Sequence, residues 1–192
     1  MQNRCFLAID VNDHVKVNVK VTQGHVKESE ADVKLVDAKN LHFTVRFLGN
    51  LSDGQVKLVI DTLEPLLSRE LSSKVSVQGL GFFGPMKEPR VIWAGVTAGK
   101  LYLEGLFTRV SDAVREILPE NDERDVIPHL TIARIRSVKN INMLRQTIVK
   151  ESETFFGEIL IDAVKLKSST LTPQGSRYTD VAVFPLCDMN SS

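Results

Sequence analysis

Two short stretches of this sequence, LHFTV at residues 41–45 and PHLTI at residues 128–132, decide how the whole chain is interpreted. Both contain a histidine, one intervening residue and a threonine, and both continue with an aliphatic residue. In a β-strand, side chains at positions i and i+2 point to the same face, about 6.5–7 Å apart. Each stretch therefore predicts a strand that presents a histidine beside a threonine, His42 with Thr44 and His129 with Thr131.

These residue types suit chemistry at a phosphate. Histidine has an ordinary pKa of roughly 6.5, so an imidazole acts as acid or base near neutrality. Two imidazoles on opposite sides of one phosphorus support an in-line displacement, in which one activates the nucleophile and the other protonates the leaving oxygen. A threonine hydroxyl can donate to a phosphate oxygen. We therefore predict that His42 and His129 are catalytic and that Thr44 and Thr131 bind phosphate.

A single histidine on a strand is more often structural than functional. The repeat favours function, because two of the four histidines in the chain share the same context. His14 and His25 lie in a polar stretch and are most simply solvated.

Two arginines follow the motifs and are further candidates for phosphate binding. Arg46 falls on the same face of a regular strand as His42 and Thr44. Arg134 falls on the opposite face from His129, so a bulge or a strand end is needed to turn it inward. For both arginines, a solvated surface position is the equally simple alternative.

No metal site is expected from the sequence. The two motifs supply only two nitrogen ligands, and no HExxH or nearby carboxylate pattern completes a set. The two cysteines, Cys5 and Cys187, lie at opposite ends of the sequence, which argues against a disulfide framework.

The composition of the 192 residues, with 43% hydrophobic and 25% charged residues, is that of an ordinary globular protein with one domain or two small lobes. The 24 basic and 24 acidic residues cancel, which disfavours coating of nucleic acid by bulk charge but allows a local basic pocket. Neither a membrane-length apolar run nor a signal-peptide core is evident, so we expect a cytoplasmic protein.

Hydrophobic spacing predicts interleaved strands and helices, and hence an α+β fold. The predicted strands are residues 4–10, 41–47, 74–81, 90–96, 128–133, 153–168 and 177–184. The predicted helices are residues 56–67, after a capping box at Ser52 and Gln55 and kinked or ended by Pro65, 103–118 and 141–148. Residues 11–26 stay open, because their valines fit both a strand and a helical stripe, while β-branching favours the strand. The GxGxxG match at residues 79–84 is interpreted as a turn, because prolines follow where a dinucleotide site needs a helix.

Further stretches accompany the two motifs in a fixed order. They are RCFLAID at residues 4–10, NLHFTVRFLG at 40–49, PRVIWAGV at 89–96, PHLTIAR at 128–134, LTPQG at 171–175 and FPL at 184–186. With this ordered set the chain resembles the 2H phosphoesterases, and within them the RNA 2′,3′-cyclic phosphodiesterases, historically called 2′-5′ RNA ligases. Two departures are Leu35, where a tryptophan is expected, and residues 27–32, which match nothing in the pattern.

The resemblance implies one bilobal catalytic domain over residues 1–192, with two pseudo-symmetric lobes whose antiparallel sheets line a central cleft and whose helices lie outside. It places one motif in each lobe (residues 42–44 and 129–131) and a helix after the first strand. It also implies metal-independent, cofactor-free opening of a 2′,3′-cyclic phosphate to a 2′-phosphate, reversible as 2′-5′ ligation. The implied partner is RNA with such an end, for example a tRNA fragment, bound by a monomer away from membranes.

Two other functions remain open at this point. The protein can be an enzyme of the same kind that acts on another cyclic or 2′-5′-linked nucleotide, or a catalytically silent module that binds RNA ends. A local basic rim (Arg90, Arg136, Lys139 and Arg177) and base-stacking aromatics (Tyr178, Phe82, Phe83 and Trp93) are compatible with each reading, although core packing is the simpler role for most of the aromatics.

Overall fold

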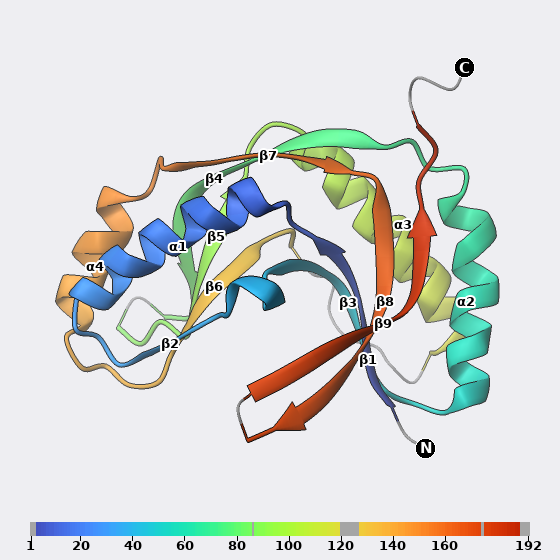
Figure 1. Cartoon of the computed structure of the whole chain (residues 1–192), viewed down its shortest axis with the longest axis horizontal. Coiled ribbons are helices and arrows are strands. Elements are labelled where there is room, and N and C mark those ends of the chain that lie inside the picture. The colour runs from blue at the N-terminus through green and yellow to red at the C-terminus, as the bar shows by residue number, and fades with distance from the viewer. Residues whose placement is uncertain (1–2, 86, 120–126, 174, 189–192) are drawn as a thin grey trace.

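The computed structural model describes residues 3–85, 87–119, 127–173 and 175–188, and shows a curled antiparallel sheet with helices along its outer side (Figure 1). The strands are β1 (Asn3–Asp10), β2 (Val33–Leu35), β3 (His42–Leu51), β4 (Ser73–Phe83), β5 (Val91–Val96), β6 (Leu130–Ile135), β7 (Phe155–Ile161), β8 (Ala163–Thr172) and β9 (Gly175–Pro185). The helices are α1 (Asp13–Glu28), α2 (Asp53–Leu67), α3 (Lys100–Ile117), α4 (Ile141–Lys150) and the short 3₁₀ helix η1 (Ala38–Asn40). The fold class is α+β, as the sequence predicts.

The strands form one sheet in the order β7-β4-β5-β6-β3-β1-β8-β9, with β2 paired to β6. We call β3, β1, β8 and β9 the β3 half, and β6, β5, β4, β7 and β2 the β6 half. The halves meet at β3 and β6, which share a single pair of facing residues, Phe43 and Leu130. The two sheets that the resemblance implies are thus the two halves of one continuous curled sheet.

The helices divide between the two halves. α2 and α3 pack together and contact β9 and β3, whereas α1 and α4 pack together and contact β7, β6 and β4 (Figure 1). Successive elements often change half: α1 follows β1 but covers β7, and α3 follows β5 but contacts β3. Within the described ranges, no helix is long and apolar enough to span a membrane.

Residues 11–26, left open by the sequence, are helical over most of their length. Asn12 caps α1, its side-chain oxygen accepting from the backbone N–H of Val15 at 3.0 Å. Val15 and Val19 are fully buried on one face of the helix, whereas Val17 is 62% exposed on the other. Burial of a helical stripe therefore outweighs the preference of valine for strands.

The prediction of one strand over residues 153–168 is wrong. The chain turns at Asp162, so that β7 pairs with β4 in the β6 half and β8 pairs with β1 in the β3 half. The turn expected at residues 79–84 is also wrong up to Phe83, because β4 continues to that residue. Gly81 lies beneath the indole of Trp93, with which any side chain at this position would collide.

Candidate active site

His42 is the first residue of β3, on the concave side of the sheet. Its Nδ1 donates a hydrogen bond to the backbone carbonyl of Asn40 at 2.7 Å, which leaves Nε2 without a proton in the neutral ring. The hydroxyl of Thr44 lies 3.2 Å from that Nε2. The imidazole packs against Phe6 and Tyr178, with ring centroids 5.1 and 5.4 Å away. These contacts fix the tautomer and direct Nε2 toward Thr44.

His129 immediately precedes β6 and is held in the same manner. Its Nδ1 donates to the backbone carbonyl of Ile127 at 2.7 Å, the same two-residue step back along the chain. Its ring meets Phe83 edge to face, with centroids 4.7 Å apart. Both motif histidines therefore present Nε2 as the reactive nitrogen.

Burial lowers the pKa of both imidazoles below the usual 6.5, because a charged ring is poorly solvated there. The hydrogen bond to the backbone opposes this effect in each case. Lys167 and His129 lower the pKa of His42 further, while Asp10 raises it. For His129, the charge of Arg134 adds to the lowering. At neutral pH the free protein thus holds both rings largely neutral.

The position of Arg46 differs from the sequence-based prediction. The pairing of β1 with β3 skips Val45 between the Ala8–Thr44 and Leu7–Arg46 pairs, so the alternation of faces reverses after Thr44. Arg46 consequently points away from His42 and Thr44 and is only 1% exposed. The expectation that it shares their face is wrong.

The same irregularity in the other half turns Arg134 inward. The pairing of β5 with β6 skips Ile132 between the Trp93–Thr131 and Ile92–Ala133 pairs. The residue five positions after the histidine therefore faces the cavity in both halves. That residue is Phe47 in β3 and Arg134 in β6, and both line the central cavity.

We call the space between the two halves the central cavity, with a volume of about 580 Å³. It brings together His42 and Thr44 from β3 with Thr131 and Arg134 from β6. Its other lining residues are Arg4, Cys5, Phe6, Val36, Asn40, Phe47, Gly49, Ser169, Ser176 and Tyr178. His129 is outside this lining set, but its charge acts on His42 across the site. A cavity with two arginines and no carboxylate in its lining suits a phosphate.

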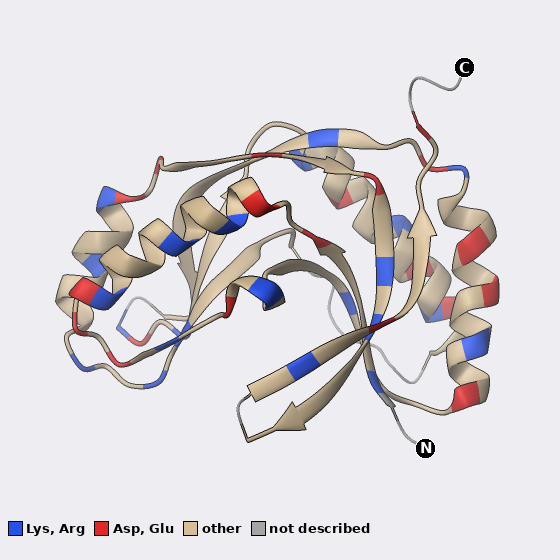
Figure 2. Cartoon of the chain, in the orientation of Figure 1, with Lys and Arg blue, Asp and Glu red and all other residues tan. Residues whose placement is uncertain are grey.

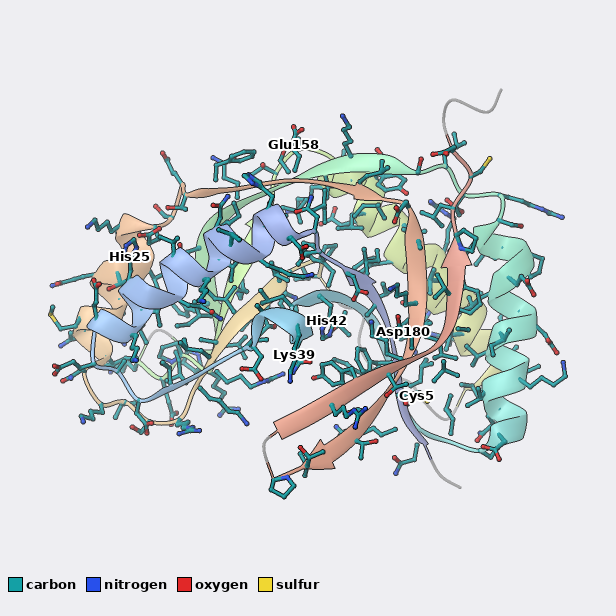
Figure 3. The ribbon with its side chains drawn as sticks, in the orientation of Figure 1. Cys5, His25, Lys39, His42, Glu158 and Asp180 are labelled. Carbon is teal, nitrogen blue, oxygen red and sulfur yellow. The ribbon has the colours of Figure 1, made fainter. Side chains whose placement is uncertain are left out.

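An ionic network lies beside His42. Asp10 faces His42 across β1 and β3, and its carboxylate is 2.8 Å from Lys165 and 3.1 Å from Lys167. Asp180 pairs with the same two lysines at 3.0 and 2.5 Å (Figure 3 labels His42 and Asp180). Burial raises the pKa of Asp10, but the two lysines outweigh it and the net pKa is lowered. Both aspartates therefore stay ionised at neutral pH, and the network acts on the pKa of His42 in both directions, through Lys167 and Asp10.

Sequence reasoning missed several residues of this site. Arg4, Cys5 and Phe6 are consecutive on β1 and all line the cavity, which no alternating pattern in the sequence indicates. Asn40 holds His42 through its backbone carbonyl, so the identity of its side chain does not reveal this role. Among the described residues, no cluster of three His, Cys, Asp or Glu side chains could hold a metal ion.

Comparison with known proteins shows which family this chain resembles. The model of the AKAP7 2′5′ RNA ligase-like domain matches residues 5–186. The chain belongs to this 2′-5′ RNA ligase-like family of 2H phosphoesterases.

Two relatives share about a third of their residues with this chain. The RNA 2′,3′-cyclic phosphodiesterase of Methanothermobacter thermautotrophicus is 32% identical over 97% of this chain and 100% of its own length. That of Aquifex aeolicus is 34% identical over 83% and 87%. Among solved structures, TT0787 of Thermus thermophilus superposes with a TM-score of 0.79 at 24% identity over 97% and 99% of the chains. Apo LigT of E. coli gives 0.76 at 21% identity over 96% and 98%. At this identity, the two structures establish the fold.

Proposed function

We propose that this protein is an RNA 2′,3′-cyclic phosphodiesterase that opens the cyclic phosphate to a 2′-phosphate. One observation carries the proposal: two His-x-Thr motifs, one from each half, hold their histidines through the same Nδ1 hydrogen bond beside one cavity. Relatives at 32% and 34% identity bear this activity as their name.

The reaction divides between the two histidines. One neutral imidazole accepts the proton of a water that attacks phosphorus, while the other, protonated, donates to O3′ as the P–O3′ bond breaks. The new P–O bond to the attacking water leaves a 2′-phosphate and a 3′-hydroxyl. With an RNA 5′-hydroxyl in place of water, the same steps form a 2′-5′ linkage, which makes ligation the accompanying reaction.

Three side chains serve the phosphate in this scheme. The hydroxyls of Thr44 and Thr131 donate to its non-bridging oxygens, and the Arg134 guanidinium stabilises the charge that develops on them. The Thr44 hydroxyl, 3.2 Å from His42 Nε2, needs only a rotation to change partner. Arg46, directed away from the site, has no part in it.

The test uses an RNA oligomer with a 2′,3′-cyclic phosphate end, in EDTA and without added nucleotide. We expect the wild-type protein to convert the end to a 2′-phosphate. No conversion by folded protein contradicts the proposal for this substrate, and conversion only of small cyclic nucleotides or of 2′-5′-linked ones supports an enzyme with another substrate. RNA-end binding without turnover in any of these assays indicates a binding module.

We also propose that residues 1–192 act as one bilobal catalytic unit, as a monomer in the cytoplasm, with RNA ends such as those of tRNA fragments as substrate. Elements that change half from one to the next support a single unit. Light scattering at assay concentration tests the monomer: a mass of one chain is expected, and a stable dimer contradicts it.

A further inference from the structure

A second cavity, of about 540 Å³, opens between η1 and the end of the β8–β9 hairpin. We call it the hairpin cavity. Four residues line both this cavity and the central one: Asn40, His42, Ser176 and Tyr178. His42 therefore lies between the two cavities, and the phosphodiesterase reaction as described uses only the central one.

The partition between the two cavities is a built feature. The side-chain amide of Asn40 donates to the backbone carbonyl of Ser176 at 3.2 Å, which ties η1 to β9. Tyr178, two residues further along β9, places its ring edge to face against His42 and against Phe6, whose centroid is 4.9 Å away. The partition thus holds an aromatic ring and the reactive imidazole in fixed relation.

Two cations border the hairpin cavity and are available to a ligand. Lys39 on η1 and Arg177 on β9 are exposed, and neither forms an ion pair with any residue in the described ranges. Figure 3 shows Lys39 beside His42, and Figure 2 shows basic positions on η1 and on the hairpin that borders it. Lys167 also lines the cavity, but Asp10 and Asp180 balance its charge.

The hairpin cavity differs from the central cavity because carboxylates are part of its lining. Asp10 is engaged by two lysines, whereas Asp37 is exposed at the start of η1. A carboxylate repels phosphate but accepts hydrogen bonds from sugar hydroxyls. A lining that combines an aromatic ring, a carboxylate and two available cations therefore fits a nucleotide with its sugar better than an isolated phosphate.

We propose that the hairpin cavity binds the nucleotide of the RNA chain that adjoins the reacting end, with Lys39 and Arg177 on its backbone phosphate and Tyr178 against its nucleoside. The inference rests on the proposed phosphodiesterase activity and extends it, because it makes an RNA chain, rather than a free cyclic mononucleotide, the preferred substrate. The second phosphate is tethered to the first, so its contacts add to binding without a second association step.

The test compares two substrates, 2′,3′-cyclic AMP and the dinucleotide ApA ending in a 2′,3′-cyclic phosphate, which differ by one nucleotide, that is, one nucleoside and one phosphate. The readout is the ratio of kcat/KM for the dinucleotide to that for the mononucleotide. We expect a wild-type ratio of about ten or more, as one charged phosphate contact gives. The ratio should fall to about one or two in the double variant Lys39→Gln/Arg177→Gln, and should fall in the wild type as salt is raised.

A matched double variant, Lys20→Gln/Arg69→Gln, removes the same charge from exposed positions outside both cavities and should retain the wild-type ratio. Equal rates on both substrates in the wild type, or an unchanged ratio in Lys39→Gln/Arg177→Gln, would overturn the inference. A ratio that falls in Arg4→Gln instead would also overturn it and would place the chain at the far end of the central cavity. Failure of the wild type on both substrates would overturn the proposed function, and the inference with it.

Discussion

The two halves of the sheet present the same motif in different surroundings. In both, Nδ1 of the histidine is held by the carbonyl two residues earlier, and strand pairing skips one residue after the threonine. The residue that this skip turns inward is Phe47 in one half and Arg134 in the other. The repeat therefore sets a symmetric geometry, and the neighbouring residues make the charge asymmetric, with the motif arginine on one side only.

The surroundings of the two histidines also differ between the halves. His42 contacts two aromatic rings and lies beside a network of two lysines and two aspartates. His129 contacts Phe83, and the neighbouring charge that lowers its pKa is that of Arg134. Burial lowers the pKa of both imidazoles, and different neighbouring charges then distinguish two chemically identical residues.

The largest expected effect comes from removing either histidine. His42→Ala and His129→Ala should each lower kcat on an RNA cyclic-phosphate end by roughly 10²–10⁴, the usual contribution of a general acid or base. The double variant should be little worse than either single one, because the two act as a unit. His14→Ala, exposed on α1, is the control and should keep wild-type kcat. A fully active His129→Ala would show that the β6 half supplies no catalytic histidine.

The next effect separates Arg134 from Arg46, which are one motif position apart. Arg134→Gln should lower kcat/KM by about ten- to a hundredfold through loss of a charged contact to phosphate, and should leave the thermal unfolding midpoint nearly unchanged. Arg46→Gln should lower the free energy of unfolding by roughly 2–4 kcal/mol, because the side chain is buried, with a smaller effect on kcat/KM. The reverse pattern would place Arg46 at the phosphate.

A smaller effect concerns the side-chain contacts that join α1 to the end of α4 over the β6 half. Glu151, 6% exposed at the end of α4, accepts hydrogen bonds from Thr22 and Thr154 and pairs with His25 at 2.7 Å. Glu151→Gln should lower the free energy of unfolding by about 1–2 kcal/mol at pH 7, measured by chemical denaturation. The exposed Glu153→Gln is the control and should be neutral.

That loss should depend on pH. Burial raises the pKa of Glu151, but the hydrogen bonds from Thr154, His25 and Thr22 outweigh it, so the folded pKa lies below the usual 4.5. The stabilisation is present above the unfolded pKa and is lost as pH falls through the folded one. The difference between wild type and Glu151→Gln should therefore shrink below about pH 4.5. A difference that grows on acidification would contradict this assignment.

The subtlest prediction concerns the ionic network. Lys167→Gln removes a charge that lowers the pKa of His42 and leaves Asp10, which raises it, paired with Lys165 alone, so both changes move that pKa upward. One limb of the pH profile of kcat/KM should move to higher pH, and the limb that moves identifies whether His42 serves as base or acid in the free enzyme. Movement of neither limb would exclude an influence of the network on the site.

Much of this site can be predicted from the sequence because the motif encodes its own geometry. Two copies of His-x-Thr predict two strands with paired side chains, and they also indicate that Arg134 needs a bulge to face inward. The skip at Val45 leaves no comparable mark, since alternation through Arg46 looks regular in the sequence. Strand irregularities are set by packing against neighbouring strands, which a linear pattern does not contain.

Long-range pairing limited the prediction elsewhere. Hydrophobic residues stand on both sides of Asp162, so residues 153–168 resemble one strand, although the chain leaves one half of the sheet there and enters the other. The buried positions change from Ile159 and Ile161 to Val164 and Leu166 at this point. The partition beside His42 joins Asn40 to Ser176, 136 positions later. The helical stripe of α1 was visible in its valines, but only burial against β7 distinguishes it from a strand.

The most direct test of the account is the pH profile of single-turnover rates on an RNA cyclic-phosphate end for the wild type, His42→Ala and His129→Ala. We expect a bell-shaped profile for the wild type, because one neutral and one protonated histidine are needed. We also expect each variant to lose a different limb of that bell. A wild-type profile with a single limb, or loss of the same limb in both variants, would contradict the claim that the two halves supply one acid and one base to the same phosphorus.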